Sequence, residues 1–288
     1  MSTSGTVSVV IVTHNSLPAV LSCLKRLNPG QPESPHQIVV VDNGSDDGTP
    51  DAIRQAYAAV ALIHNAENAG FARACNTGAE ASTGEYLLFL NPDLDIDGDA
   101  VDALLSVARS TPKAGLVAGR LRYPDGTFQA NCRNFPTVTN LLFSRGSVMG
   151  RLLFSRLSSH SGFYTLPDYD AVTEVPAVAA TMALIRRDLF KRVRGFDPRF
   201  FMYMEDTDLS LRLHYAGYVN LFVPHAGGVH GFGVGSRAGR LKRSWHHHQS
   251  VWKYFLKHFP NGFSLFLLPV LLTFNLMLSA VVPPRRRK

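Results

Sequence analysis

Two stretches decide the fold class: residues 7–14, VSVVIVTH, and residues 37–49, QIVVVDNGSDDGT. Each begins with an apolar, β-branched run and ends in polar residues, as strands buried in a parallel sheet do. Between them, LPAVLSCLKRL (17–27) has apolar residues at helical spacing, with Pro18 suited to a first turn. A strand, a helix and a strand in this order predict a right-handed crossover unit.

The alternation continues to about residue 100. Residues 51–57 and 70–82 have helical patterns, while ALIHN (61–65) and EYLLFLNPDLDI (85–96) have strand patterns. We therefore expect an α/β fold with a mostly parallel sheet flanked by helices. In such sheets ligands bind beyond the carboxyl ends of the strands. The predicted strand ends are rich in Asn and Asp, which indicates a site there: residues 13–15, 42–45, 65–68 and 91–93.

Composition narrows the function classes. The chain has 288 residues, 45% of them apolar, and a net charge of +7, which suits an anionic membrane surface or a phosphorylated substrate. Cys23, Cys75 and Cys132 are widely spaced and indicate neither a disulfide framework nor a zinc site. No Gly-x-Gly-x-x-Gly follows the first strand, so a dinucleotide site is disfavoured. Nucleic acid is not expected as a partner, because the basic residues cluster beside apolar segments.

Residues 201–213, FMYMEDTDLSLRL, place Glu205, Asp206 and Asp208 in an apolar context. Burying a carboxylate is costly unless it gains a partner, a metal or a proton to handle. Taken alone, the pattern favours the first turn of a helix, where acidic residues suit the helix dipole. Asp208 is expected to pair with Arg212 one turn later.

Six segments in this order resemble glycosyltransferase family 2, whose members are inverting enzymes of the GT-A fold, and particularly its bacterial rhamnosyltransferase-like members. The resemblance spans about residues 7–236. It implies a GT-A domain over 1–240, with a nucleotide-sugar half at about 1–100 and an acceptor half at about 101–240. The segments are VSVVIVTHN, VVVDNGSDDGT, NAENAGFARACNTGA, LFLNPDLDI, GFDPRFFMYMEDTDLSLRLHYAGY and HGFGVGS.

The resemblance assigns roles to residues of this chain. It implies a Mg²⁺ or Mn²⁺ ion on Asp93, the last acid of a metal motif written here as Asn91-Pro92-Asp93, with Asp95 a weaker candidate. His230 matches a late histidine that reaches the metal or the diphosphate, and His225 is the alternative. The residues implied to bind the nucleotide sugar are Thr13, Asn15, Asp42, Asn68, Gly70, Phe71, Arg73, Asn76 and Asn91.

The resemblance also implies the chemistry. Asp206 would be the catalytic base and Glu205 would position the acceptor, with inversion in a single displacement. Relatives often carry a Trp and a Ser-Gly-Ala run where this chain has Ala177 and Ala179 to Thr181, so L-rhamnose from dTDP-rhamnose is only the favoured donor. The alternatives are a sugar nucleotidyltransferase, which would need a glycine-rich basic loop after the first strand, and a non-catalytic scaffold, which would have lost Asp93 or Asp206.

The C-terminal residues 241–288 predict membrane-associating helices. Ser244 is a candidate N-cap for a basic amphipathic helix, in which His246 to His248 are expected on a solvated face. Residues 263–282 form a run of 20 residues without charge. A re-entrant or interfacial hairpin is favoured over a single span, with a buried core helix as the further alternative. We expect an enzyme on the cytoplasmic face of the cell membrane, peripheral or C-terminally anchored, with a lipid-linked or glycan acceptor.

Overall fold

The computed structural model describes residues 7–27, 37–137, 166, 168–231, 239–262 and 264–281. Within these ranges, a mixed sheet of 10 strands runs in the order β3-β2-β1-β4-β11-β6-β12-β5, with β7 beside β6 and β9 beside β12. Its strands are β1 (Val7–Thr13), β2 (Gln37–Asp42), β3 (Ala61–His64), β4 (Tyr86–Leu90), β5 (Leu94–Ile96), β6 (Ala114–Arg122), β7 (Phe128–Gln129), β9 (Thr173–Val175), β11 (Met182–Arg186) and β12 (Val219–His230). A separate two-stranded sheet pairs β8 (Cys132–Arg133) with β10 (Ala177–Val178).

The first half is the predicted parallel sheet. β1 pairs in parallel with β2 and β4, and β2 with β3. Alternation along β1 divides the core, because Val9 and Ile11 pack in the cluster of α1 (Leu17–Leu27), whereas Val10 packs in that of α3 (Phe71–Glu80). The remaining helix of this half, α2 (Thr49–Ala56), connects β2 to β3. The expected helices and strands before residue 90 are thus confirmed.

The second half departs from the expected parallel arrangement. β11 runs antiparallel to both β4 and β6, and β5 runs antiparallel to β12. The expected strand at 85–96 divides into β4 and β5, which lie far apart in the sheet. The sheet as a whole is therefore mixed rather than mostly parallel, because the chain enters β11 from the small β8–β10 sheet and not through a helical crossover.

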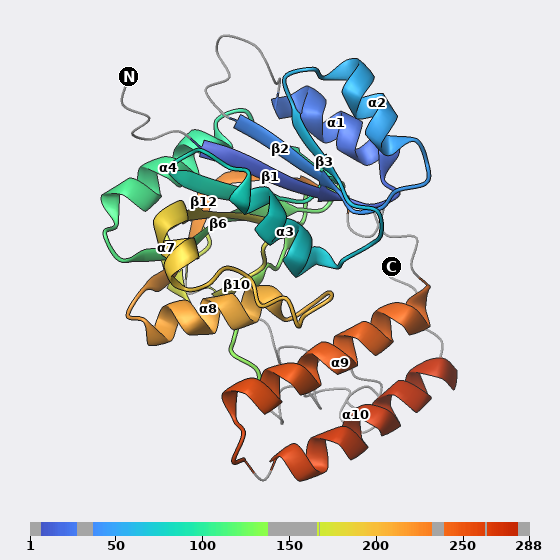
Figure 1. The fold of residues 1–288 in the computed structure, drawn as a ribbon. Coiled ribbons are helices and arrows are strands. Elements are labelled where there is room, and N and C mark those ends of the chain that lie inside the picture. The colour runs from blue at the N-terminus through green and yellow to red at the C-terminus, as the bar shows by residue number, and fades with distance from the viewer. Residues whose placement is uncertain are drawn as a thin grey trace.

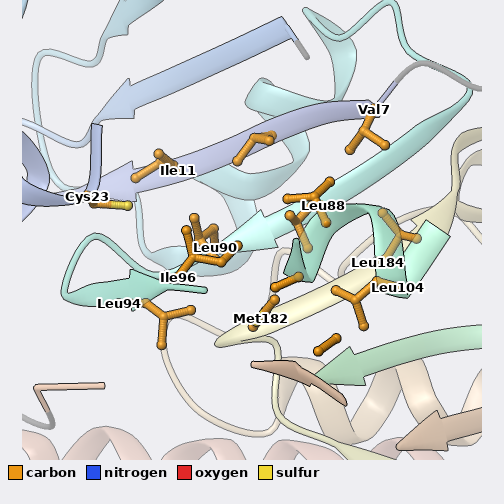
Figure 2. Packing of buried hydrophobic residues seen from close by; sticks show 14 of the residues in the cluster. Val7, Ile11, Cys23, Leu88, Leu90, Leu94, Ile96, Leu104, Met182 and Leu184 are labelled. Atoms are coloured by element: carbon orange, nitrogen blue, oxygen red, sulfur yellow. The ribbon is translucent and has the colours of Figure 1, made fainter. Parts of the chain in front are cut away.

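Figure 2 shows the core where the two halves meet. Leu88 of β4 and Leu184 of β11 are paired in register and fully buried. Leu104 of α4 (Ala100–Ser110) belongs to the same cluster of buried residues, as does Cys23 of α1. The cluster spans strands of both halves, so the parallel and antiparallel parts share one hydrophobic core.

Two long helices follow the sheet. α9 (Arg240–His258) and α10 (Ser264–Val281) lie side by side on the flank of α8 (Glu205–Tyr215), seen in red in Figure 1. Tyr254 and Phe255 of α9 and Leu268 of α10 are buried with residues of α8 and of the loop before it. Over the described residues, none of the helices combines the length and apolar character needed to cross a membrane.

One expectation for this region is wrong: α9 begins at Arg240, so Ser244 lies inside the helix rather than at its N-cap. The expected solvated face of the three histidines is confirmed only in part, because His247 is exposed whereas His246 and His248 are half-buried. His246 stacks on Phe201 and His247 lies edge-on to Tyr203, while His248 accepts a hydrogen bond from Asn275 of α10 at 2.9 Å.

Between β11 and α8 the chain forms α7 (Arg187–Arg192) and an irregular loop, residues 193–204. Tyr203 and Met204 at its end have positive φ angles of 71° and 68°. This conformation costs an ordinary residue about 1–2 kcal/mol. The loop is fixed to α9, because Ser250 Oγ donates to Met202 O at 2.8 Å and Lys253 Nζ donates to Arg199 O at 2.8 Å.

Candidate active site

The first group of polar side chains lies at the adjacent ends of β1 and β2. Thr13 pairs in register with Asp42, and both side chains are buried. Asp42 Oδ2 accepts hydrogen bonds from the Ser45 amide at 3.0 Å and contacts His64 Nδ1 at 2.9 Å. Asp42 Oδ1 and Thr13 Oγ1 are buried without a hydrogen-bond partner among the described residues. Both atoms can accept a hydrogen bond from a ligand or a water, because buried polar groups are normally paired.

The loops around this group are held by asparagines. Asn15 Oδ1 accepts from the Asp46 amide at 2.9 Å, so its side chain joins the loops after β1 and β2. Asn43 Nδ2 donates to Asn68 Oδ1 at 2.9 Å, and Asn68 Oδ1 also accepts from the Gly70 amide. Asn15 and Asn68 therefore shape the rim of the site, and Asn43 is a positioning residue absent from the sequence-based set.

The start of α3 contacts the loop that precedes α8. Gly70 has φ 87°, and a Cβ there would lie 2.6 Å from Phe201 O. Phe71 N donates to the same oxygen at 2.8 Å. Asn76 bonds the backbone of Phe196 with both ends of its amide, at 2.8 and 2.9 Å, while Arg73 is exposed. Gly70, Phe71 and Asn76 thus join the two halves of the domain.

A second group lies around β5 and the end of β12. Asp93 Oδ1 is 3.1 Å from His230 Nε2, and Asn91 Nδ2 is 3.4 Å from the same nitrogen. Asp93 and His230 are almost fully buried, at 9% and 7% side-chain exposure. Asp95 instead forms an ion pair with Arg26, 2.6 Å between Oδ1 and Nε. The expected residues Asn91, Asp93 and His230 are brought together, and Asp95 has a different partner.

The donor set around His230 fits a divalent cation. Gln129 Oε1 lies 3.1 Å from His230 Nδ1, so a proton on Nδ1 leaves the Nε2 lone pair facing the Asp93 carboxylate. Two facing lone pairs repel unless a proton or a cation lies between them. Within the described residues no three His, Cys, Asp or Glu side chains form a metal cluster. A Mg²⁺ ion that is also coordinated by substrate phosphates nevertheless usually has only one or two protein ligands.

The third group is Glu205 and Asp206 in the first turn of α8, where the sequence predicted a helix start. Both side chains are buried, and Asp206 Oδ1 accepts from the Thr207 amide at 2.7 Å. Burial, and after it the charge of Asp206, raises the pKa of Glu205 to about 8. Glu205 Oε2 has no hydrogen-bond partner among the described residues. With this pKa, Glu205 holds its proton at neutral pH beside Asp206.

Asp208, the third acid, is structural. Arg212 Nε donates to its Oδ2 at 2.8 Å, which confirms the expected i,i+4 pair. Lys257 Nζ and His258 Nε2 of α9 reach Oδ1 at 2.5 and 2.7 Å. Burial alone would raise the pKa of Asp208, but these hydrogen bonds and the charge of Arg212 lower it. Asp208 therefore fixes α9 to the helix that carries Glu205 and Asp206.

One short segment contacts two of these groups. Gln129 touches His230, and Arg133, four residues later, lies 3.8 Å from Asp206 Oδ2. The same five-residue segment therefore connects the two groups along the chain. Neither Gln129 nor Arg133 was expected from the sequence. His225, the alternative to His230, is exposed.

Comparison with known proteins shows the family of the chain. The sequence model described as "Glycosyl transferase family 2" matches residues 8–194. The chain belongs to glycosyl transferase family 2. It is 32% identical over 235 residues to the N-acetylglucosaminyl-diphospho-decaprenol L-rhamnosyltransferase of Mycobacterium tuberculosis, covering 77% of this chain and 75% of the relative. It is 26% identical over 232 residues to the rhamnosyltransferase WbbL of Escherichia coli K12, covering 78% and 83%.

Solved structures of glycosyltransferases share the fold. The mannosyltransferase PcManGT from Pyrobaculum calidifontis, in complex with GDP-Man and Mn²⁺, superposes with a TM-score of 0.59 at 21% identity, covering 96% of this chain and 73% of that one. GalNAc-T7 with UDP, GalNAc and Mn²⁺ gives 0.58 at 16% identity, covering 87% and 47%. The expected GT-A architecture of this family 2 member is thereby confirmed.

Proposed function

We propose that this family 2 glycosyltransferase is an inverting enzyme that transfers a sugar from a nucleoside diphosphate donor to a sugar on a polyprenyl diphosphate. The observation that carries the proposal is the segment 129–133, which links the Asp93–His230 pair to Asp206. A site that joins a cation-binding pair to a buried carboxylate suits displacement of a diphosphate by a hydroxyl. The named acceptor of the mycobacterial relative, a diphospho-decaprenol, supports the lipid-linked class.

The nucleoside would bind at the ends of β1 and β2. Asp42 Oδ1 can accept from an N–H of the base or from a ribose hydroxyl, and Thr13 Oγ1 can bond beside it. Such a contact would remove the cost of leaving both buried atoms unpaired, about 1–3 kcal/mol each. The asparagine-held loops keep this pocket in shape.

Asp93 and His230 would hold Mg²⁺ or Mn²⁺, with Asn91 beside them. When bound, the cation would neutralise the negative charge that grows on the departing diphosphate. Gln129 fixes the ring of His230 so that Nε2 faces Asp93. We do not assign Asp95 to the cation, because its partner is Arg26.

Asp206 is the general base. It takes the proton from the acceptor hydroxyl while that oxygen forms a bond to the anomeric carbon, and the bond from this carbon to the diphosphate oxygen breaks on the opposite face. Such proton transfer contributes roughly 10²–10⁴ to the rate. Glu205 is protonated near neutral pH and can donate a hydrogen bond to the acceptor.

L-rhamnose from dTDP-rhamnose is the favoured donor, supported by the rhamnosyltransferase names of both relatives. Ala177, where relatives often carry a Trp, pairs with Arg133 across the β8–β10 sheet. Small side chains from Ala177 to Ala180 leave more room beside the catalytic pair than an indole would. The donor experiment below identifies the sugar that is transferred.

We also propose that the α9–α10 hairpin associates peripherally with the cytoplasmic face of the cell membrane. Exposed apolar side chains recur every three or four residues along α10, which places them on one face. A bilayer surface fits this face because the chain has a net charge of +7 and the proposed acceptor is anchored in a membrane by its lipid. The residues of this face are Phe266, Val270, Phe274 and Met277, with Leu267 beside them.

The test is a panel of nucleotide sugars incubated with the purified protein, Mn²⁺ or Mg²⁺, and N-acetylglucosaminyl diphosphoryl polyprenol in detergent. We expect nucleoside diphosphate release from one donor and a product of opposite anomeric configuration by NMR. Retention of configuration would contradict the inverting mechanism. Pyrophosphate release from a nucleoside triphosphate and a sugar 1-phosphate would indicate a nucleotidyltransferase instead, and binding of a nucleotide without turnover of any donor would favour a scaffold.

A further inference from the structure

The side of the catalytic pair that faces α9 carries a group of cations. Arg133 Nη1 lies 3.8 Å from Asp206 Oδ2, and its side chain keeps 38% exposure, whereas Asp206 keeps 10%. Arg133 therefore reaches from the solvent to the general base. An arginine that contacts a buried base and still presents donors to solvent has free capacity for an anionic ligand.

A second arginine approaches from α9. Arg243 and His247 are four residues apart, so they lie on the same face of the helix. His247 packs edge-on against Tyr203, with ring centroids 5.6 Å apart. Burial raises the pKa of Tyr203, and the charges of Arg243 and Arg133 both act against this rise. Both guanidinium groups are thus within electrostatic reach of the same phenol, next to Glu205.

This position fits the acceptor rather than the donor. The donor diphosphate would lie at Asp93 and His230, which the segment 129–133 contacts through Gln129 and not through Arg133. In a polyprenyl diphosphate sugar, the diphosphate is attached one sugar ring away from the hydroxyl that attacks. With that hydroxyl at Asp206, the diphosphate falls within one sugar ring of the base, which Arg133 contacts.

The hairpin offers a surface for the lipid beyond this point. α10 is fixed to α9 by the hydrogen bond between Asn275 and His248, and its opposite face exposes Phe266 and Val270 at 80% and 64%. A lipid diphosphate needs cations close to an apolar surface. α9 supplies the cation Arg243, and the exposed face of α10 supplies the apolar surface. A soluble glycan acceptor would need neither.

We propose that Arg133 and Arg243 form a binding site for the diphosphate of the lipid-linked acceptor. The assignment deepens the proposed function and rests on it for the identity of the acceptor. Arginine suits the task because its planar guanidinium bonds two phosphate oxygens at once. Arg133 would leave Asp206 for the diphosphate when the acceptor binds, which makes the base accessible to the acceptor hydroxyl.

The test compares two acceptors that carry the same sugar: N-acetylglucosaminyl diphosphoryl farnesol and a neutral octyl N-acetylglucosaminide. For Arg133→Gln and Arg243→Gln we expect the KM of the diphosphate acceptor to rise about tenfold or more while the KM of the donor stays unchanged. For Arg243→Gln, which does not touch the base, kcat/KM for the octyl acceptor should also stay unchanged. Arg133→Lys should retain part of the affinity. The control is Arg54→Gln, at an exposed arginine on α2 whose guanidinium pairs with Asp51.

Three results would overturn the assignment. An equal loss with both acceptors would show that Arg133 acts only by shaping Asp206. A higher KM for the donor would assign the diphosphate contact to the nucleotide sugar. Unchanged kinetics in both variants would exclude any role, and thermal melting shows whether each variant is folded.

A binding experiment separates this inference from the proposed function. Farnesyl diphosphate in detergent is titrated into the wild-type protein and each variant by calorimetry. Binding that is weakened about tenfold in both variants supports the site even if no donor is turned over, in which case only the proposed function fails. Equal binding to all proteins, or none to wild type, overturns the site whatever the activity.

Discussion

Asp93 Oδ1 and His230 Nε2 lie 3.1 Å apart although 137 residues separate them in the sequence. Both belong to the margin of the sheet where β5 pairs with β12, and Gln129 holds the imidazole from its other nitrogen. The contact brings the chain just after β4 against the end of β12. If the pair holds the divalent cation, removing either side chain should raise the metal concentration that activity requires.

His230→Ala should therefore raise the Mn²⁺ concentration needed for half-maximal activity by about 10–100-fold, since one of the two protein ligands is lost. The measurement is a metal titration of nucleoside diphosphate release at saturating donor. His225→Ala, the exposed alternative on the same strand, is the matched control and should behave as wild type. An unchanged Mn²⁺ requirement in His230→Ala would exclude His230 as a ligand.

Gly70→Ala should destabilise the protein strongly. Residue 70 has φ 87°, and the new Cβ would meet Phe201 O at 2.6 Å, so the loop before α8 would have to move. We expect a loss of about 2–4 kcal/mol in the free energy of unfolding, from the positive φ and the overlap together. Gly48→Ala is the control, because Gly48 has φ 83° but open space around it.

In urea titrations, Gly48→Ala should lose only the backbone cost, about 1–2 kcal/mol. The difference between the two variants measures how tightly α3 packs on the catalytic loop. Equal losses would show that the loop at Phe201 can move without a loss of stability. Gly70 would then be needed only for its backbone conformation.

Because of Glu205, the free energy of unfolding should fall as the pH rises. Its pKa is raised from 4.5 to about 8, so between these values the folded state holds a proton that the unfolded state has released. The stabilising contribution is complete below pH 4.5 and is lost as the pH rises through about 8. The slope from this group is at most about 1.4 kcal/mol per pH unit.

Glu205→Gln cannot lose the proton and should flatten this part of the stability curve, measured by urea unfolding from pH 5 to pH 9. Glu80→Gln, at an exposed position on α3, should leave the wild-type slope in place. A wild-type slope retained in Glu205→Gln would mean that Glu205 is ionised in the folded protein at neutral pH.

The exposed face of α10 predicts binding to anionic vesicles. Phe266→Glu combined with Val270→Glu should abolish co-sedimentation with phosphatidylglycerol vesicles, because two charges replace side chains that are 80% and 64% exposed. Tyr215→Glu, a 68% exposed position on α8, is the control for a new surface charge. The melting temperature should not change in either protein, and vesicle binding unaffected by the double substitution would contradict the membrane assignment.

The sequence predicted the first half of the sheet well because its strands are continuous apolar runs whose polar ends must share one edge of a parallel sheet. It predicted the Asp208–Arg212 pair for a similarly local reason, the helical repeat. It missed Gln129 and Arg133, which lie in two-residue strands with no repeating pattern. Asn43 could have been found, since it follows β2 directly and faces Asn65 and Asn68 in the next loop.

The C-terminal helices show the opposite limit. Polarity predicted that His246 to His248 face solvent, but His246 and His248 are half-buried against Phe201 and α10, which are distant in the sequence. Likewise, Asn275 joins α10 to α9, a role that its place in an apolar run does not predict. Contacts between helices determine the environments of these histidines and of Asn275, and the periodicity of the sequence does not predict such contacts.

The most direct test of the central claim is the turnover of Asp206→Asn with the lipid-linked acceptor. At saturating substrates we expect kcat to fall by about 10²–10⁴, because the general base is lost, while the affinity for the nucleotide measured by calorimetry is unchanged. Asp51→Asn, an exposed carboxylate on α2, should retain full activity. A kcat in Asp206→Asn equal to that of wild type would contradict the assignment of the base and with it the proposed mechanism.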